Sequence, residues 1–149
     1  MLNRWKRHLI YLKKLNAVIV IDDIASDEEH ELDLMFHTDA DTENVIQKEN
    51  GATVNMQRSV MEIKRLTPEN LKIKQGDYEV YSRSGALAYT KYTMELFNTT
   101  SEWKNAMAFT WTDKGAVPAE VTLTKNGNEW VFDCNGETIT FDWTTETVK

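Results

Sequence analysis

The sequence predicts an all-β protein, an antiparallel β-sandwich of about ten to twelve short strands. Three observations support this class. Apolar and polar residues alternate in short runs, helical periodicity is almost absent, and turn-forming pairs such as Asn126-Gly127 separate the runs. With no repeat of fixed period and no linker, residues 1–149 are expected to form a single domain.

Three consecutive strand signals lie near the amino terminus. Residues 7–13 alternate, with His8, Ile10 and Leu12 on one side. Residues 17–21 form an unbroken apolar run that ends at Asp22-Asp23, which predicts a central strand buried on both faces. Residues 31–37 alternate again, with the apolar side chains inward.

The middle of the chain predicts a loop followed by short strands. Residues 38–50 are polar and acidic, with one possible helical turn at 42–47. Strands are then expected at residues 52–57, 59–66, 71–74, 78–83 and 88–97, and the later breaks between them contain glycine. Thr67-Pro68 places an N-cap residue before proline, which predicts a brief helical turn at a corner between strands.

The last third contains the clearest strand pattern. A strand over 103–112 leads to a three-strand meander at 120–125, 129–134 and 137–143. The pair Asn126-Gly127 suits a type I′ turn, and Asn135-Gly136 marks the second connection. Trp130, Phe132 and Cys134 share one face of the strand 129–134, and Ile139, Phe141 and Trp143 share one face of the strand 137–143. Most of the five tryptophans are expected in the core.

Charge and composition exclude several classes of partner. The net charge is -7, with 24 acidic and 17 basic residues, which argues against nucleic acid and anionic membranes as partners. An anionic polysaccharide would need a local basic patch. The longest apolar run is far shorter than the roughly 18 residues of a membrane span. Cys134 is the single cysteine and is interpreted as a small buried apolar residue rather than a reactive thiol.

The amino-terminal block resembles the C-terminal β-rich region of heparinase II/III-like bacterial polysaccharide lyases. The matching residues are Arg7, Ile10, Leu12, Lys13, the run 18–23, His30, Leu34, Phe36 and His37. The match covers about the first forty residues, whereas the remainder is similar only in being β-rich. In these lyases an α/α toroid carries the catalytic Asn or His and Tyr, and a His-x-His segment lies where the β region begins; neither occurs here.

The resemblance therefore implies that this chain is the C-terminal part of a longer lyase. Its implied partners are an N-terminal α/α toroid domain and an acidic polysaccharide, and the parent enzyme can carry a structural zinc. The chain itself is expected to hold no catalytic residue, no cofactor and no metal. The resemblance leaves the substrate and the compartment open, because such enzymes are either exported or retained.

Several titratable residues have the chemistry of a metal or catalytic site. His8, His30 and His37 with Asp22 and Asp23 are possible zinc ligands by type, but their spacing does not support a site. The histidines are expected to cap strand ends or to pair with carboxylates of residues 27–31. The aspartates are expected to bond turn amides or Arg7 rather than to act as an acid/base pair.

The cluster Tyr89, Lys91 and Tyr92 has the residue types of a lyase base and acid, since a phenol near a cation ionises more readily. Tyr89 and Tyr92 lie on opposite faces of a regular strand, so a structural role is expected.

Three hypotheses follow. The first is a non-catalytic β-sandwich module of a heparinase II/III-like lyase. The second is an independent carbohydrate-binding module, which requires exposed tryptophans. The third is a small self-contained enzyme that uses His37 and nearby acids.

Overall fold

The computed structural model describes residues 1–38, 42–67, 72–81, 84–85 and 87–149, and the side chains of residues 42, 72–81 and 87–93 fall outside this description. The described residues contain eleven strands and two short 3-10 turns, arranged in two antiparallel sheets. The predicted all-β sandwich of ten to twelve strands is therefore confirmed. No helix in the described part of the chain is long and apolar enough to span a bilayer.

The larger sheet has seven strands in the order β1-β2-β7-β5-β4-β3, with β6 also paired to β7. Its strands are β1 (Leu2–Leu12), β2 (Ala17–Thr38), β3 (Val45–Lys48), β4 (Gly51–Asn55), β5 (Ser59–Arg65), β6 (Lys72–Tyr81) and β7 (Leu87–Asp113). The smaller sheet has the order β11-β10-β9-β8. Its strands are β8 (Val121–Asn126), β9 (Glu129–Cys134), β10 (Glu137–Asp142) and β11 (Thr147–Val148). The 3-10 turns are η1 (Lys13–Leu15) and η2 (Thr42–Asn44).

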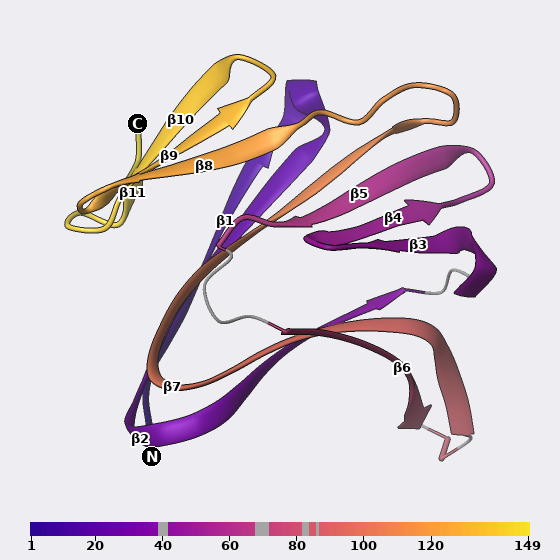
Figure 1. Ribbon diagram of the computed structural model, residues 1–149, viewed down its shortest axis with the longest axis horizontal. Coiled ribbons are helices and arrows are strands. Elements are labelled where there is room, and N and C mark those ends of the chain that lie inside the picture. Colours follow the sequence, from indigo (N-terminus) through magenta and orange to yellow (C-terminus); the bar gives the residue numbers. More distant parts are fainter. Residues whose placement is uncertain (39–41, 68–71, 82–83, 86) are drawn as a thin grey trace.

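Strands β2 and β7 are the long central pair of the larger sheet, and they bend together. Ala25 pairs with Glu102 and His30 pairs with Thr100, so four residues of β2 oppose one residue of β7. This bulge bends the pair, and the Ser26 hydroxyl donates to the Glu28 carbonyl inside it at 2.6 Å. Beyond the bend, the two strands turn back beneath β3–β5 (Figure 1).

The long strands correct the prediction at three places. Residues 17–21 and 31–37 were expected to be separate strands, but both belong to β2. Residues 88–97 and 103–112 likewise belong to β7, and the described parts of 71–74 and 78–83 belong to β6. A bulge can bend a strand without ending it, and the polar residues at the bends imitate a loop.

Shorter connections were predicted more closely. The helical turn expected at 42–47 is the 3-10 turn η2, but it ends at Asn44 and the strand β3 follows it.

In the hairpin between β9 and β10, Asn135 and Gly136 both have positive φ, as a type I′ turn requires. At the hairpin between β8 and β9, Asn126 pairs with Glu129, so Gly127 and Asn128 are the two central residues of the turn. Of these two, only Gly127 has positive φ. That pattern belongs to a type II′ turn, one residue later than predicted. The helical turn expected after Thr67 lies outside the described residues.

Two hydrophobic cores lie on opposite faces of β2 and β7. Because side chains alternate along a strand, Ile19, Ile21 and Ala108 face the smaller sheet, while Val20 and Met107 face the interior of the bent larger sheet. The first core includes Ile10, Val121, Trp130, Phe132, Cys134, Ile139 and Phe141. The second includes Ile24, Leu34, Ala52, Val54, Ile63, Met94, Leu96 and Trp103. The central strand buried on both faces is therefore confirmed.

The tryptophans largely follow the prediction. Trp103 and Trp130 are buried, and Trp111 and Trp143 are half-buried. The Trp143 ring contacts the rings of Trp130 and Phe141, each with centroids 5.0 Å apart. Trp5 is the exception, because it is exposed on β1.

Asn105 is a polar residue inside the second core. Its side chain is 1% exposed, and within the part of the chain that the structure describes neither amide atom has a hydrogen-bond partner. A buried polar group without a partner costs about 1–3 kcal/mol. Replacing Asn105 by leucine, which has a similar branched shape, is expected to raise the free energy of unfolding by a similar amount. Urea denaturation of the two proteins measures the difference.

Asn105→Asp is a control that should change the free energy of unfolding in the opposite direction. It places a carboxylate at the same buried position and should destabilise the fold. A loss of stability in Asn105→Leu would contradict the prediction, because it would mean that the amide is bonded in solution.

Candidate functional site

Asp22 and Asp23 lie in the middle of β2 and form ion pairs on opposite faces of the sheet. Arg7 Nε donates to Asp22 Oδ1 at 2.7 Å, and Arg7 Nη2 donates to Asp22 Oδ2 at 3.0 Å. Arg4 Nη2 donates to Asp23 Oδ1 at 3.0 Å, with Arg4 Nε 2.8 Å from Oδ2. The predicted bond between Asp22 and Arg7 is confirmed, whereas the alternative of turn amides is wrong because no turn follows Asp23.

These pairs hold both carboxylates in a structural role. The hydrogen bond to Asp22 raises the pKa of Arg7, and the hydrogen bond to Asp23 raises the pKa of Arg4. Asp22 is fully buried, and Trp5 Nε1 also donates to its Oδ1 at 3.3 Å. A carboxylate engaged by a cation on a buried strand is poorly placed to accept a substrate proton.

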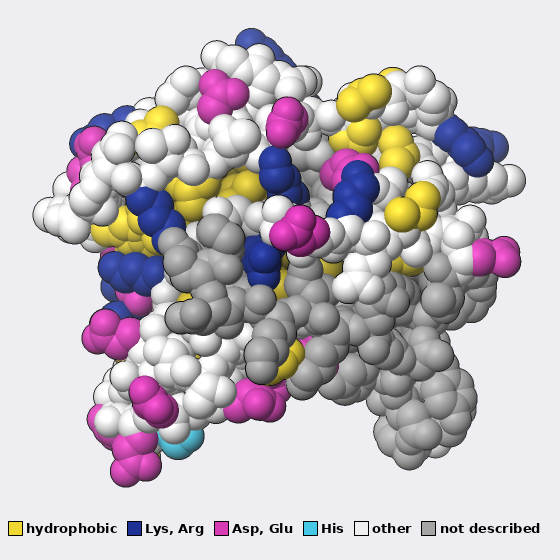
Figure 2. Space-filling view, in the orientation of Figure 1, with side chains coloured by type: hydrophobic (Ala, Val, Ile, Leu, Met, Phe, Trp, Pro, Cys, Tyr) yellow, Lys and Arg dark blue, Asp and Glu magenta, His cyan; other side chains and the backbone are white. Residues whose placement is uncertain are grey.

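The three histidines lie apart. His8 is on β1, where its ring packs on Phe141 with centroids 4.8 Å apart. His30 is exposed at the bend of β2. The hydrogen bond from Asn3 is the main cause that lowers the pKa of Asp27, and His30 makes a smaller electrostatic contribution. This is one of the predicted alternatives, an interaction with the acidic run of residues 27–31. Figure 2 shows acidic side chains gathered over this bend.

His37 lies near the far end of β2 and lines a cavity of about 330 Å³. The other lining residues are mostly apolar, among them Phe36, Met61 and Phe109. Across residues 1–38, 42–67, 72–81, 84–85 and 87–149, no group of three His, Cys, Asp or Glu side chains is arranged to hold a metal ion. The described residues therefore do not supply a ligand set for the structural zinc that the resemblance implies for the parent enzyme.

The backbone of Tyr89, Lys91 and Tyr92 belongs to β7, but these side chains lie outside the described residues. Their structural role stays a prediction.

Cys134 is fully buried in the first core. Burial, with smaller contributions from Asp133 and Glu137, raises the pKa of the thiol to about 11. Since the thiolate is the reactive form, native protein at pH 8 is expected to resist a thiol reagent such as dithionitrobenzoate, and protein unfolded in guanidinium to react at once. Rapid labelling of the native protein would contradict this prediction.

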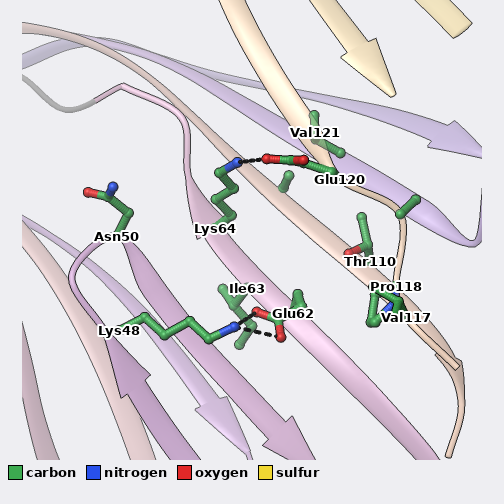
Figure 3. A pocket seen from close by; sticks show the side chains of 12 residues that line it. Lys48, Asn50, Glu62, Ile63, Lys64, Thr110, Val117, Pro118, Glu120 and Val121 are labelled. Atoms are coloured by element: carbon green, nitrogen blue, oxygen red, sulfur yellow. Dashed lines mark hydrogen bonds and ion pairs between the residues drawn. The ribbon is translucent and has the colours of Figure 1, made fainter. Parts of the chain in front are cut away.

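A further cavity, of about 410 Å³, lies between the larger sheet and the segment 117–121 that leads into β8 (Figure 3). Its floor is formed by Ala108, Thr110 and Val121, all buried. Val117 and Pro118 form an apolar wall.

Two ion pairs border this cavity (Figure 3). Lys48 Nζ lies 2.8 Å from Glu62 Oε2, and Lys64 Nζ lies 3.3 Å from Glu120 Oε1. The Thr53 hydroxyl also donates to Glu62, at 2.6 Å. Because Glu62 and Glu120 each face a lysine, the described lining presents paired charge, and neither carboxylate is placed as a free base for proton transfer.

Sequence reasoning did not identify this cavity. The alternation of residues 59–66 places Glu62 and Lys64 on one face, which was the available signal. Their partners are Lys48 on β3 and Glu120 in the segment before β8, and these could not be assigned without the sheet order.

The fold is similar to solved heparan sulfate lyases. The crystal structure of heparan sulfate lyase HepC from Pedobacter heparinus matches with a TM-score of 0.73 and 11% identity, over 96% of this chain and 24% of that chain. A HepC mutant from the same organism matches with a TM-score of 0.73 and 12% identity, over 93% of this chain and 23% of that chain. Heparinase III matches with a TM-score of 0.68 and 13% identity, over 91% of this chain and 23% of that chain.

No family model and no curated protein sequence matches the chain. The likeness therefore concerns the fold. It confirms, at that level, the predicted resemblance to a β-rich region of heparinase II/III-like lyases. The chain spans about a quarter of the length of the lyases that it matches, and it has the fold of one all-β part of them.

Proposed function

We propose that this chain is a non-catalytic C-terminal β-sandwich domain of a heparinase II/III-like polysaccharide lyase, and that it supports a catalytic α/α toroid domain. The observation that carries the proposal is the match to the lyases, which covers almost all of this chain but only 23–24% of theirs. One domain of a larger enzyme would have this relationship to the whole.

The geometry of the titratable residues supports a non-catalytic role. Asp22 and Asp23 are engaged by arginines, and Cys134 is a buried thiol. The histidines are dispersed over β1, the bend of β2 and the far end of β2. General acid/base catalysis needs an acid and a base within reach of one substrate, and none of these candidates supplies such a pair.

In the proposed parent enzyme, a base removes the proton α to a uronate carboxylate, and the glycosidic oxygen leaves by β-elimination. Hydrogen-bond donors or a cation stabilise the carboxylate during the reaction. We assign these roles to the toroid domain. In the proposal this chain contributes rigidity and one side of the enzyme, without cofactor or metal.

The proposal is tested by incubating the 149-residue chain with heparin, heparan sulfate and alginate and following the ultraviolet absorbance of unsaturated uronate. A complete lyase serves as the positive control. The proposal predicts no increase above buffer. An increase would refute it, and comparison with His37→Ala would then decide whether the third hypothesis, a small enzyme that uses His37, accounts for the activity.

A further inference from the structure

The face of β1 that continues the sheet face of the second core carries a row of exposed large side chains, since Trp5 and Leu9 lie opposite Ile24 and Val20 of β2. Trp5, Leu9 and Tyr11 are 57%, 67% and 59% exposed, although all three are apolar or aromatic. They occupy alternate positions with Arg7 between the first two, so all four project from the same face of the strand. We name these four residues, together with Trp111, the β1 platform. Contiguous exposed apolar surface of this kind marks interaction sites.

Trp5 is held in a fixed orientation. Its indole N–H donates to Asp22 Oδ1 at 3.3 Å, and Asp22 is fully buried. The Arg7 guanidinium, which binds the same carboxylate, lies 5.7 Å from the centre of the Trp5 ring. An exposed ring with its polar atom bonded inward presents the apolar ring surface to a ligand and loses little side-chain freedom on binding.

An aromatic pair lies at the other end of the row. The rings of Tyr11 and Trp111 are nearly parallel, with an interplanar angle of 9° and centroids 6.3 Å apart. The Trp111 backbone N–H donates to the Asn16 carbonyl at 3.0 Å, which ties β7 to the connection after β1. Tyr11 lies six positions after Trp5, so at about 3.4 Å per position the platform is about 20 Å long.

The charge of the platform restricts the ligand. Arg7 is the only charged member, and Asp22 neutralises it through two hydrogen bonds. The chain as a whole carries a net charge of -7, which repels polyanions. An elongated, uncharged ligand with flat apolar faces suits such a surface, and the C–H faces of pyranose rings have this property, since they stack on aromatic rings while their hydroxyl groups remain in water.

We infer that the β1 platform binds uncharged polysaccharide chains, with sugar rings stacked on Trp5 and on the Tyr11–Trp111 pair. This binding is independent of the proposed function, because a domain without eliminase activity can bind a glycan. The elimination assay tests the proposed function and the binding assay tests this inference, so failure of one is distinguishable from failure of the other.

The test is calorimetric titration of the chain with two uncharged hexasaccharides, cellohexaose and laminarihexaose, and with a heparin hexasaccharide for comparison. Saturable binding of an uncharged hexasaccharide is expected. Trp5→Ala and Tyr11→Ala should each weaken it by about tenfold, equivalent to about 1.4 kcal/mol. Trp5→Phe, which keeps an aromatic ring, should weaken it less. Ile46→Ala, an exposed apolar residue on the other edge strand β3, is the matched control and should bind as the unmodified chain does.

Each of the other outcomes would overturn the inference. These are flat titrations with both uncharged sugars, binding of the heparin fragment alone, or binding that survives both Trp5→Ala and Tyr11→Ala. A dimer in light scattering that Leu9→Ser dissociates, together with no sugar binding, would assign the platform to protein association. Circular dichroism of each variant establishes that it is folded.

Discussion

Replacing Arg7 by alanine is expected to lower the free energy of unfolding by about 3 kcal/mol, the lower end of the range for breaking a buried ion pair. The reason is the position of its partner. Asp22 is 0% exposed, and loss of Arg7 leaves a carboxylate inside the sheet with the Trp5 indole as its one remaining side-chain donor among the described residues. The lower end applies because the Arg7 side chain is 41% exposed, so solvent screens part of the interaction. Urea denaturation followed by circular dichroism measures the change.

Lys6→Ala is the matched control on the same strand. Lys6 pairs with Glu146, and both side chains are substantially exposed. Exposed ion pairs contribute little, so the urea midpoint of this variant should remain almost unchanged. Equal midpoints for Arg7→Ala and Lys6→Ala would mean that Asp22 is not a buried, arginine-dependent anion.

Replacing Gly51 by alanine is the second substitution with a large expected effect. A Cβ atom at this position would lie 1.8 Å from the backbone carbonyl oxygen of Ile63. The obstacle is backbone in the neighbouring strand β5, which cannot move without breaking the β4–β5 ladder. We expect a loss of about 3 kcal/mol or more, the upper end of overpacking costs, visible as a large decrease in the thermal midpoint.

Gly127→Ala separates this steric effect from the general cost of removing a glycine. Gly127 has φ of +59°, and a Cβ atom there meets nothing within 4 Å. Its replacement should cost about 1–2 kcal/mol from the left-handed backbone alone. A Gly51→Ala protein as stable as Gly127→Ala would show that the close approach of β4 and β5 is relaxed in solution.

Local patterns predicted the smaller sheet well. Trp130, Phe132 and Cys134 alternate along β9, and they enter the first core as expected. The pairing of Arg7 with Asp22 was also accessible, because the two residues lie opposite each other in a hairpin formed by adjacent strands. In both cases the partners are close in sequence, so periodicity and turn position determine which side chains meet.

Long-range features were not predictable in the same way. Asp22-Asp23 reads as the end of a strand, because two unpaired carboxylates would be too costly within one. Arg4 and Arg7 remove that cost from opposite faces, so β2 continues to Thr38. The cavity near β5 depends on Lys48 and Glu120, whose approach requires the complete sheet order.

The proposed scaffold role depends most on the sharing of β2 and β7 by the two cores. Strands that contribute one face to each core should couple them, so that neither can unfold alone. Differential scanning calorimetry of the isolated chain tests this directly. We predict one transition whose calorimetric and van't Hoff enthalpies agree. Two separable transitions, one for the smaller sheet and one for the bent part of the larger sheet, would contradict it.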